Sequence, residues 1–223
     1  MDFRTEDQDG MCNSLQVRWT IIPQIAPQPW LACSGCGGLR PFRSSDKVRL
    51  NANGRQLDAW LIYKCTGCDK TWNRTIFERK NVRDIDSVTL EALQSNDPDW
   101  IRAETFNLEA LRRKSQRIDE FAEFEIRKEL LRETPDWQHL EIELSISFPA
   151  SARLDRLLAS ELRVSRSQLG ALHEAGLLKT NSDRNDILRR RIRDGVRITL
   201  DLSDLGDREE VWKPLAAGPG DQA

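Results

Sequence analysis

The chain has 223 residues, enough for one large domain or two small ones, and its formal net charge is −2. Charged residues make up 31% and hydrophobic residues 39%, a composition typical of a soluble globular protein. No apolar run approaches the ~20 residues that a membrane-spanning helix needs. The first ten residues are acidic and polar, unlike a secretory signal. We therefore expect a cytoplasmic protein with no membrane partner.

The charge is unevenly distributed along the chain. Residues 151–198 carry 11 Lys and Arg against 6 Asp and Glu, whereas residues 199–223 carry 2 against 6. The net charge excludes a molecule that is basic as a whole, but this distribution indicates a basic module followed by an acidic tail.

Motifs for the common enzyme classes are missing. The sequence has no Gly-rich phosphate loop, no dinucleotide fingerprint and no Gly-x-Ser-x-Gly elbow. Its two histidines, His139 and His173, are far apart and have no obvious catalytic partner. No set of acid, base and nucleophile nominates a reaction.

The first part of the chain is expected to be rich in strands. We interpret residues 1–14 as a loosely ordered N-terminus and residues 15–86 as a β-rich domain. Residues 15–19 alternate between apolar and polar side chains, the pattern of a half-buried strand. Asn53-Gly54 separates two strand-like segments, and this dipeptide tolerates the positive φ that a tight hairpin turn needs.

Residues 87–150 are expected to hold helices followed by a strand. Asp97-Pro98 indicates a helix start, because an acidic cap precedes proline in the first turn, and Asn107 can cap another helix. The segment 121–131 fits a helix or a strand equally well. The strict alternation from Leu140 to Phe148 predicts a half-buried strand.

Residues 151–202 are expected to form a small α/β module. Leucines at helical spacing follow Arg153, and the segment from Ser165 to Gln168 is a capping box that starts a second helix. Short strands are expected after Gly176, and residues 203–223 are expected to be a disordered acidic tail. The predicted class is α+β.

Four of the five cysteines form two Cys-x-x-Cys hooks, Cys33 with Cys36 and Cys65 with Cys68. Zinc binds thiolates tetrahedrally, and such a hook lets two sulfurs approach one ion. The 28 residues between the hooks are enough for a hairpin, so we predict an N-terminal zinc ribbon with one structural Zn2+. A redox or simply buried cysteine set is the alternative.

A catalytic zinc is not expected, because four thiolates leave no open coordination position. Cys12 is most simply a spare thiol. Trp60, Tyr63 and Trp72 lie close to the second hook in the sequence. We interpret them as core packing beside the metal, with an exposed platform for stacking bases as the alternative.

The basic segment resembles the S-four-type RNA-binding domain. The resemblance covers roughly fifty residues and is carried by four blocks: Arg153-Leu-Asp-Arg156-Leu-Leu, Val164-Ser165-Arg166-Ser167-Gln168-Leu, Ala175-Gly176-Leu-Leu, and Arg193-Asp-Gly-Val-Arg-Ile198. It implies a module of two helices and short strands that presents basic side chains to structured RNA. The sequence departs from the pattern of this family at two places, and both concern the RNA-facing loop. The family's glycine after the second helix is missing near Asn181, and its Gly-Asp is reversed as Asp194-Gly195.

Positive and polar side chains in this module are the predicted RNA contacts. The residues are Arg153, Arg156, Arg166, Gln168, Lys179, Arg189, Arg190 and Arg191. Helix starts carry free backbone donors that favour phosphate, which agrees with the arginines placed there. The alternative is a solvated charged face on a domain used for packing or for protein contact.

A second resemblance covers most of the chain. It is carried by Arg49-Leu-Asn-Ala-Asn, by Leu57-Asp-Ala-Trp-Leu-Ile-Tyr-Lys-Cys65, by Thr71-Trp-Asn-Arg-Thr-Ile76 with Glu78-Arg79, and by Ser95-Asn-Asp97. These segments are similar to an uncharacterised bacterial family, domain of unknown function 1062. The resemblance implies a bacterial source and no assigned activity.

The function expected from the sequence is non-catalytic binding of a structured RNA, with the ribosome as one such partner. A zinc-ribbon adaptor for another protein is the alternative. An enzyme of unknown reaction is third.

Overall fold

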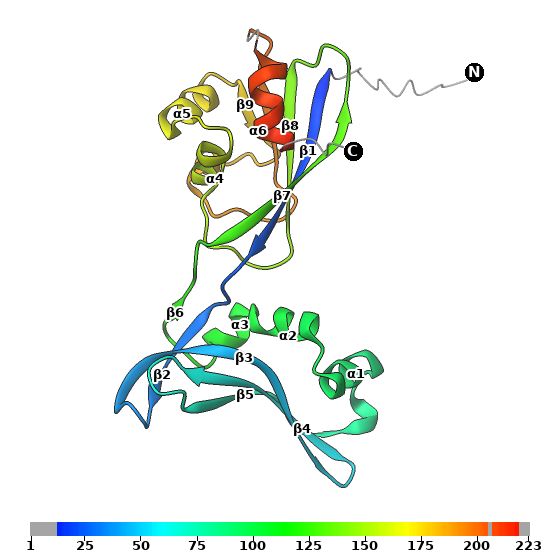
Figure 1. Ribbon diagram of the computed structural model, residues 1–223, viewed down its shortest axis with the longest axis vertical. Helices are drawn as coiled ribbons and strands as arrows, with labels where there is room; N and C mark the ends of the chain where they lie inside the picture. The colour runs from blue at the N-terminus through cyan, green and yellow to red at the C-terminus, as the bar shows by residue number, and fades with distance from the viewer. Residues whose placement is uncertain (1–12, 205–206, 219–223) are drawn as a thin grey trace, which may run out of the picture. The chain divides into compact units, whose positions relative to one another are not determined.

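The computed structural model describes residues 13–204 and 207–218. Helices and two β-sheets make the protein a mixed α+β structure, as predicted. The chain divides into two compact units, shown in Figure 1. We call residues 23–123 the inserted unit, and residues 13–22 together with 124–218 the flanking unit. The expected N-terminal segment 1–14 lies almost entirely outside the described residues, and so does Cys12.

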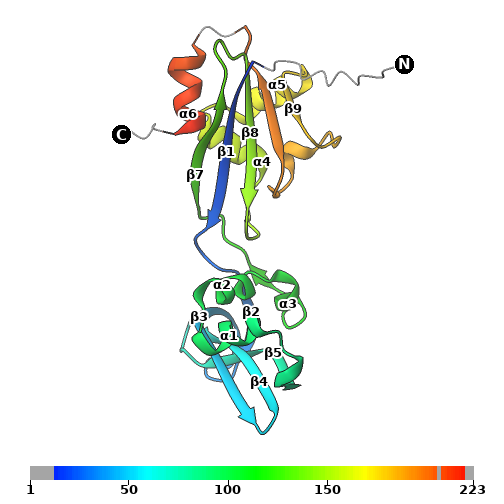
Figure 2. The ribbon, with the colours of Figure 1, turned by 90° about the vertical axis from the view of Figure 1, so that its right-hand side faces the viewer.

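The flanking unit contains a five-stranded sheet in the order β7-β1-β8-β10-β9 (Figure 2). Its strands span Phe124–Glu133 (β7), Ser14–Pro23 (β1), His139–Ile146 (β8), Arg197–Asp201 (β10) and Leu178–Thr180 (β9). β1 runs parallel to β8, whereas β8 with β10 and β10 with β9 are antiparallel. The parallel pair therefore joins segments that lie on opposite sides of the inserted unit in the sequence.

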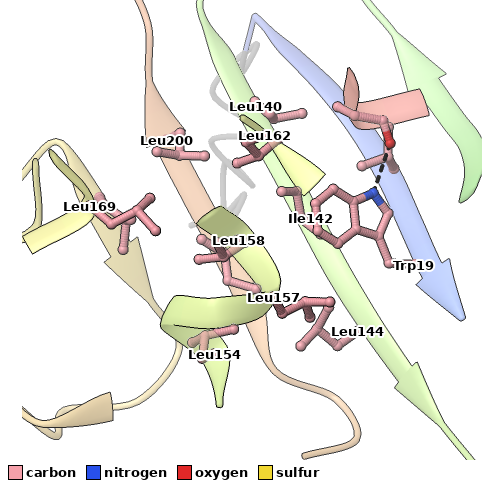
Figure 3. Close-up of a cluster of buried hydrophobic side chains, with 14 of the residues drawn as sticks. Trp19, Leu140, Ile142, Leu144, Leu154, Leu157, Leu158, Leu162, Leu169 and Leu200 are labelled. Atoms are coloured by element: carbon pink, nitrogen blue, oxygen red, sulfur yellow. Dashed lines mark hydrogen bonds between the residues drawn. The ribbon is translucent and has the colours of Figure 1, made fainter. Parts of the chain in front are cut away.

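Helices cover one face of this sheet (Figure 1). They are α4 (Leu154–Glu161), α5 (Arg166–Glu174), a 3-10 turn (Ile187–Arg189), a π-helical turn (Arg208–Trp212) and α6 (Lys213–Ala217). Alternate residues of the strands and one face of α4 form the leucine-rich core shown in Figure 3. The indole N–H of Trp19 donates to the Ala216 carbonyl at 2.7 Å, so α6 is tied to β1.

The opposite face of the flanking sheet is polar. Because side chains alternate along a strand, residues next to the buried ones point away from the helices. Gln16 donates to the carboxylate of Glu141 at 3.2 Å, and Arg18 forms an ion pair with Glu143 at 3.2 Å across the β1–β8 pair. On this face, side chains of β1 therefore pair with the side chains that lie opposite them on β8 in the parallel register.

The inserted unit contains the second sheet, in the order β5-β4-β3-β2-β6. Its strands span Thr71–Asn81 (β5), Gln56–Cys65 (β4), Gly38–Asn53 (β3), Gln28–Cys33 (β2) and Ile118–Asp119 (β6). All four strand pairs are antiparallel. The predicted turn at Asn53-Gly54 joins β3 to β4, and Gly54 has the positive φ of +59° expected there.

Helices pack on one face of this second sheet. They are α1 (Ser87–Ser95), α2 (Pro98–Thr105) and α3 (Leu108–Arg112), preceded by a 3-10 turn (Val82–Asp84). The small core between them includes Phe42, Leu61, Tyr63, Ile101 and Leu111. Figure 1 shows the three helices on the same side of β3, β4 and β5.

The units do not coincide with the linear division into 15–86, 87–150 and 151–202. The strand that begins near Leu15 lies in the sheet of the flanking unit, because it pairs with β8, and the division at residue 86 falls inside the inserted unit. The pairing brings together residues as far apart as Gln16 and Glu141, 125 positions away. The alternation of apolar and polar residues within one segment does not identify the strand with which that segment pairs.

The expectation of a disordered tail at 203–223 is wrong for residues 207–218. This segment is helical and packs on the sheet, with Trp212 9% exposed and Ala216 fully buried. Apolar residues spaced along a polar segment supply the contact. The ambiguous segment 121–131 lies mainly in a strand, β7. Among the described residues, no helix is both long and apolar enough to span a bilayer.

Candidate functional site

The two cysteine hooks lie at the ends of strands in the inserted unit. Cys33 is the last residue of β2 and Cys65 the last residue of β4, so each pair begins where a strand ends in a turn. The hairpin of β3 and β4 brings the hooks together, because Phe42 pairs with Cys65 and Gly38 with Cys33. Cys36 and Cys68 lie in the turns.

Both hooks use the same turn. The N–H of Gly37 donates to the Cys33 carbonyl at 2.9 Å, and the N–H of Asp69 donates to the Cys65 carbonyl at 3.0 Å. The donor residue has a left-handed backbone in both cases, with φ of +69° and +57°. The turn directs both sulfurs of each hook toward the other hook.

The four sulfurs form a compact cluster. Cys33 Sγ lies 3.4 Å from Cys68 Sγ, Cys36 Sγ lies 3.8 Å from Cys65 Sγ, and all four atoms lie within 4.8 Å of one another. A tetrahedral ion with metal–sulfur bonds of about 2.3 Å holds its sulfurs about 3.8 Å apart. The cluster therefore has the size of a four-thiolate metal site.

Glycines provide space where the hooks meet. A Cβ on Gly35 would lie 2.9 Å from Cys68 Sγ, and a Cβ on Gly67 would lie 3.3 Å from Cys36 Sγ. Each glycine precedes the second cysteine of its own hook and faces the second cysteine of the other. The identical Gly-Cys order in the two hooks thus has a steric cause.

Two of these thiols, Cys33 and Cys68, have pKa values shifted in opposite directions. Burial raises the pKa of Cys33, but hydrogen bonds from the Cys36 backbone and from the Cys68 and Cys65 side chains lower it to about 7. The Lys70 backbone lowers the pKa of Cys68, but the side chains of Cys33 and Cys36 outweigh it and raise this pKa to about 12. The Cys33 thiolate thus suppresses the ionisation of Cys68, and a bound cation would remove that conflict.

The three aromatic residues near the second hook do not share one environment. Tyr63 is fully buried, and its ring lies 5.2 Å from that of Trp72, which packs against the same core. Burial raises the pKa of Tyr63 to about 12. Trp60 is partly exposed and lies on the other face of β4. Core packing is therefore correct for Tyr63 and Trp72, but not for Trp60.

A second candidate site lies at the start of α4 in the flanking unit. The carboxylate of Asp155, only 5% exposed, accepts a hydrogen bond from Arg153 at 2.8 Å and one from the Nε of Arg166 at 2.8 Å, and it forms ion pairs with both arginines. Arg153 also forms a β-bridge with Arg191, and the Leu154 N–H donates to the carbonyl of the residue before Arg191. We call Arg153, Arg166, Arg190 and Arg191 the arginine cluster.

Within the arginine cluster, Arg190 also pairs with Asp186 and lowers the pKa of that carboxyl through a hydrogen bond. The remaining predicted RNA contacts are dispersed. Arg156 is exposed on α4. Arg189 lies beside the end of α5, lining a hollow with His173. Gln168 closes the predicted capping box on Ser165.

Lys179 lies apart from the arginines. Lys179 pairs with Thr199, and Thr199 pairs with Glu141, so all three side chains lie on the same, polar face of the sheet. The helices pack on the opposite face. The structure therefore brings four of the predicted contacts together and separates Lys179 from them.

The sequence matches the model of a known family over more than half of its length. That family is described as "Protein of unknown function (DUF1062)", and the match covers residues 50–184. The chain belongs to this family. The matched segment contains the second hook, α4 and α5, and begins after the first hook. No curated protein and no solved structure matches the chain significantly.

Two features of these sites were missed in the sequence. Asp155 was not singled out, although it lies between Leu154 and Leu157 and the inward leucines of α4 indicate partial burial. Residues 38–83 carry 11 Lys and Arg against 4 Asp and Glu, a larger excess than that of residues 151–198. A charge count in a moving window would have found it.

Proposed function

We propose that this protein binds structured RNA without catalysing a reaction, and that Cys33, Cys36, Cys65 and Cys68 hold one structural zinc ion. The ribosome is one such RNA-containing partner. The zinc would hold the β2–β3 and β4–β5 turns together, since a unit with so small a core gains much of its stability from a metal. Four thiolates leave no place for an activated water, so we assign the ion no chemistry.

The zinc proposal is supported by the sulfur spacing and by the all-thiolate ligand set, which zinc accepts in closed structural sites. Metal analysis of the purified protein is expected to give one zinc per chain. Cys65→Ser should lose it and unfold the inserted unit. Full zinc retention in that variant, or iron in place of zinc, would contradict the assignment.

The observation that carries the RNA proposal is the pair of guanidinium groups on Asp155. Each arginine uses part of its five N–H donors on the carboxylate, while about 35% of the Arg153 side chain and 50% of the Arg166 side chain stay exposed. A buried carboxylate thus fixes two guanidiniums from two helix starts. Fixed guanidiniums lose less entropy when they bind phosphate.

The same contact decides which residues should be changed in a test. Replacing Arg153 or Arg166 by Glu would place a carboxylate against Asp155 and destabilise the fold. The informative variant is Arg156→Gln with Arg190→Gln and Arg191→Gln, which changes two exposed members of the cluster together with the exposed Arg156 of α4. A matched control is Arg112→Gln with Arg113→Gln and Lys114→Gln, three exposed positions of the inserted unit with the same change in charge.

Binding to a pool of hairpin RNAs at two salt concentrations provides the measurement. Wild type and control should bind alike, and the cluster variant should bind at least about tenfold more weakly. Its plot of log affinity against log salt should also be shallower, by about 0.9 for each phosphate that the variant no longer neutralises. Equal binding by all three proteins, or no binding of wild type at low salt, would refute the proposal.

A protein partner is the second candidate function, and an apolar groove favours it. The groove has a volume of about 1070 Å³ and lies between α5 and the C-terminal helices of the flanking unit. Its apolar lining includes Leu162, Val164, Ala171, Leu172, Val211, Trp212 and Leu215. Such a groove fits an amphipathic helix of another protein. Leu172→Arg should abolish that association and leave hairpin binding unchanged.

A further inference from the structure

Figure 1 shows α1, α2 and α3 on one side of the β3–β4–β5 sheet, so within their unit they leave its outer face uncovered. The strand register places the ring of Trp60 among basic side chains on this outer face. Alternate residues of β4 are buried toward the helices, namely Leu57, Ala59, Leu61, Tyr63 and Cys65. The residues between them therefore face outward, and among these are Trp60, Ile62 and Lys64.

The strand register places positive charge next to this ring. Arg49 is opposite Trp60, with its guanidinium carbon 6.0 Å from the ring centroid, and Arg43 is opposite Lys64. On the other side, Trp60 is opposite Thr75 and Lys64 is opposite Thr71. We call Arg43, Arg49, Trp60, Ile62 and Lys64 the sheet platform.

The surroundings of the platform are also basic. Residues 38–83 carry 11 Lys and Arg against 4 Asp and Glu, whereas the whole chain carries a charge of −2. Of the 11 cations, Arg74 is buried and the other ten are exposed.

Two of the acidic groups near the platform are held by local hydrogen bonds. Asp58 accepts from the Arg79 N–H at 2.6 Å, and Glu78 accepts from Thr75 at 3.2 Å and from the Trp60 indole at 3.4 Å. Asp69 forms an ion pair with Arg43 at 3.5 Å. The positive charge exceeds what these groups balance.

We propose that the sheet platform binds an unpaired stretch of RNA, with a base stacked on Trp60 and the backbone phosphates contacted by Arg43, Arg49 and Lys64. A stacking ring combined with a positively charged track is what binds single strands without sequence preference. Bases within a duplex offer no free face to the ring, so paired RNA is not the expected ligand. This inference rests on the proposed function, because it gives the same RNA ligand a second, single-stranded contact.

The test uses the full-length, zinc-loaded protein and two fluorescent probes measured by anisotropy. One probe is a 12-nucleotide oligouridine, and the other is a blunt RNA hairpin without tails. Trp60→Leu should weaken oligouridine binding about tenfold and leave hairpin binding unchanged, since one stacked base contributes on the order of that factor. Trp60→Phe should retain most of the binding, because a ring remains.

A second part of the test removes the positive charge of the platform with a variant that combines Arg43→Gln, Arg49→Gln and Lys64→Gln. The control is the variant in which Arg112, Arg113 and Lys114 are changed to Gln. The platform variant should show a salt dependence of oligouridine binding shallower by about 2, at about 0.7 per phosphate contact on a single strand. The control should behave as wild type. This part of the test also decides the question if Trp60→Leu fails to fold, which zinc content and circular dichroism would reveal.

The possible outcomes separate the two proposals. If wild type does not bind oligouridine, or if the platform variants bind it as wild type does, the platform inference is refuted whatever the hairpin result. If oligouridine binding depends on the platform while hairpin binding is absent, the arginine-cluster proposal fails and the platform stands. Equal loss of both probes in the platform and control variants would also refute the inference, because it would indicate only non-specific attraction.

Discussion

A Cβ atom on Gly35 would lie 2.9 Å from the Sγ of Cys68, in the opposite hook. This distance is shorter than real Cβ contacts, so a side chain at residue 35 would push the two hooks apart. The reciprocal contact, between Gly67 and Cys36, is less tight at 3.3 Å. The two glycines set how closely the four sulfurs can approach.

Gly35→Ala is expected to weaken zinc binding at least about tenfold, because the displaced Cys68 can no longer complete a tetrahedron with bonds of about 2.3 Å. Competition with a chromophoric zinc chelator measures this directly. Gly38→Ala, at the first residue of β3 directly after the same turn, is the matched control, since a Cβ there meets no atom within 4 Å and the backbone needs no glycine. Equal zinc affinity in the two variants would show that the hooks can relax, and Gly67→Ala should fall between them.

Asp155→Asn is expected to destabilise the flanking unit by about 2 kcal/mol. The change keeps the shape of the side chain but leaves Arg153 and Arg166 without their counter-charge. Breaking a fully buried pair costs about 3–5 kcal/mol, and the partial exposure of both arginines reduces this. Urea denaturation measures the difference. Asp186→Asn, in the exposed pair with Arg190, is the control and should leave the midpoint unchanged.

Local features of the fold were predictable from the sequence because their causes are local. Asp97, Asn107 and Ser165 each accept a hydrogen bond from the backbone N–H three residues later, at 2.7, 3.0 and 3.1 Å. A cap is a matter of residue type and spacing within one turn, so the sequence contains all of it. The cysteine hooks were predictable for the same reason: two short motifs each specify their own turn.

Long-range relationships could not be predicted in the same way. The alternation around Trp19 predicts a strand but does not identify β8 as its partner, 125 residues away in register. The anchoring of Arg153 by Asp155 depends on how α4 and α5 pack, so the sequence suggested free arginines where the structure has ion pairs. The placement of Trp60 was predictable, by contrast: it lies three residues before Tyr63 in β4, and the alternation of side chains along a strand puts it on the opposite face.

Arg74 and Glu104 form an ion pair, and we expect the loss of one partner to cost more stability than the loss of the other. The Arg74 side chain is 2% exposed and that of Glu104 is 27% exposed, with 2.7 Å between guanidinium nitrogen and carboxylate oxygen. Glu104→Gln leaves a buried cation without compensation and should cost about 3 kcal/mol of unfolding free energy. Arg74→Met removes the buried charge and leaves a carboxylate that can reach water, so it should cost less, about 1 kcal/mol. Denaturant titration of both variants checks the order, and a larger cost for Arg74→Met would contradict the account.

Two adjacent residues of the C-terminal helical segment, Val211 and Trp212, can test whether this segment belongs to the folded core. Trp212 is 9% exposed and belongs to the core of the flanking unit, whereas the preceding Val211 is 43% exposed. Trp212→Ala should cost about 3 kcal/mol, because it removes a large buried ring and leaves a cavity beside α6. Val211→Ala should change stability by less than about 0.5 kcal/mol, as most exposed substitutions do. Thermal and urea denaturation of the two variants would settle whether residues 207–218 are part of the folded core. If both variants unfold with the wild-type midpoint, this segment contributes nothing to the stability of the flanking unit, and the apolar groove loses one of its walls as well.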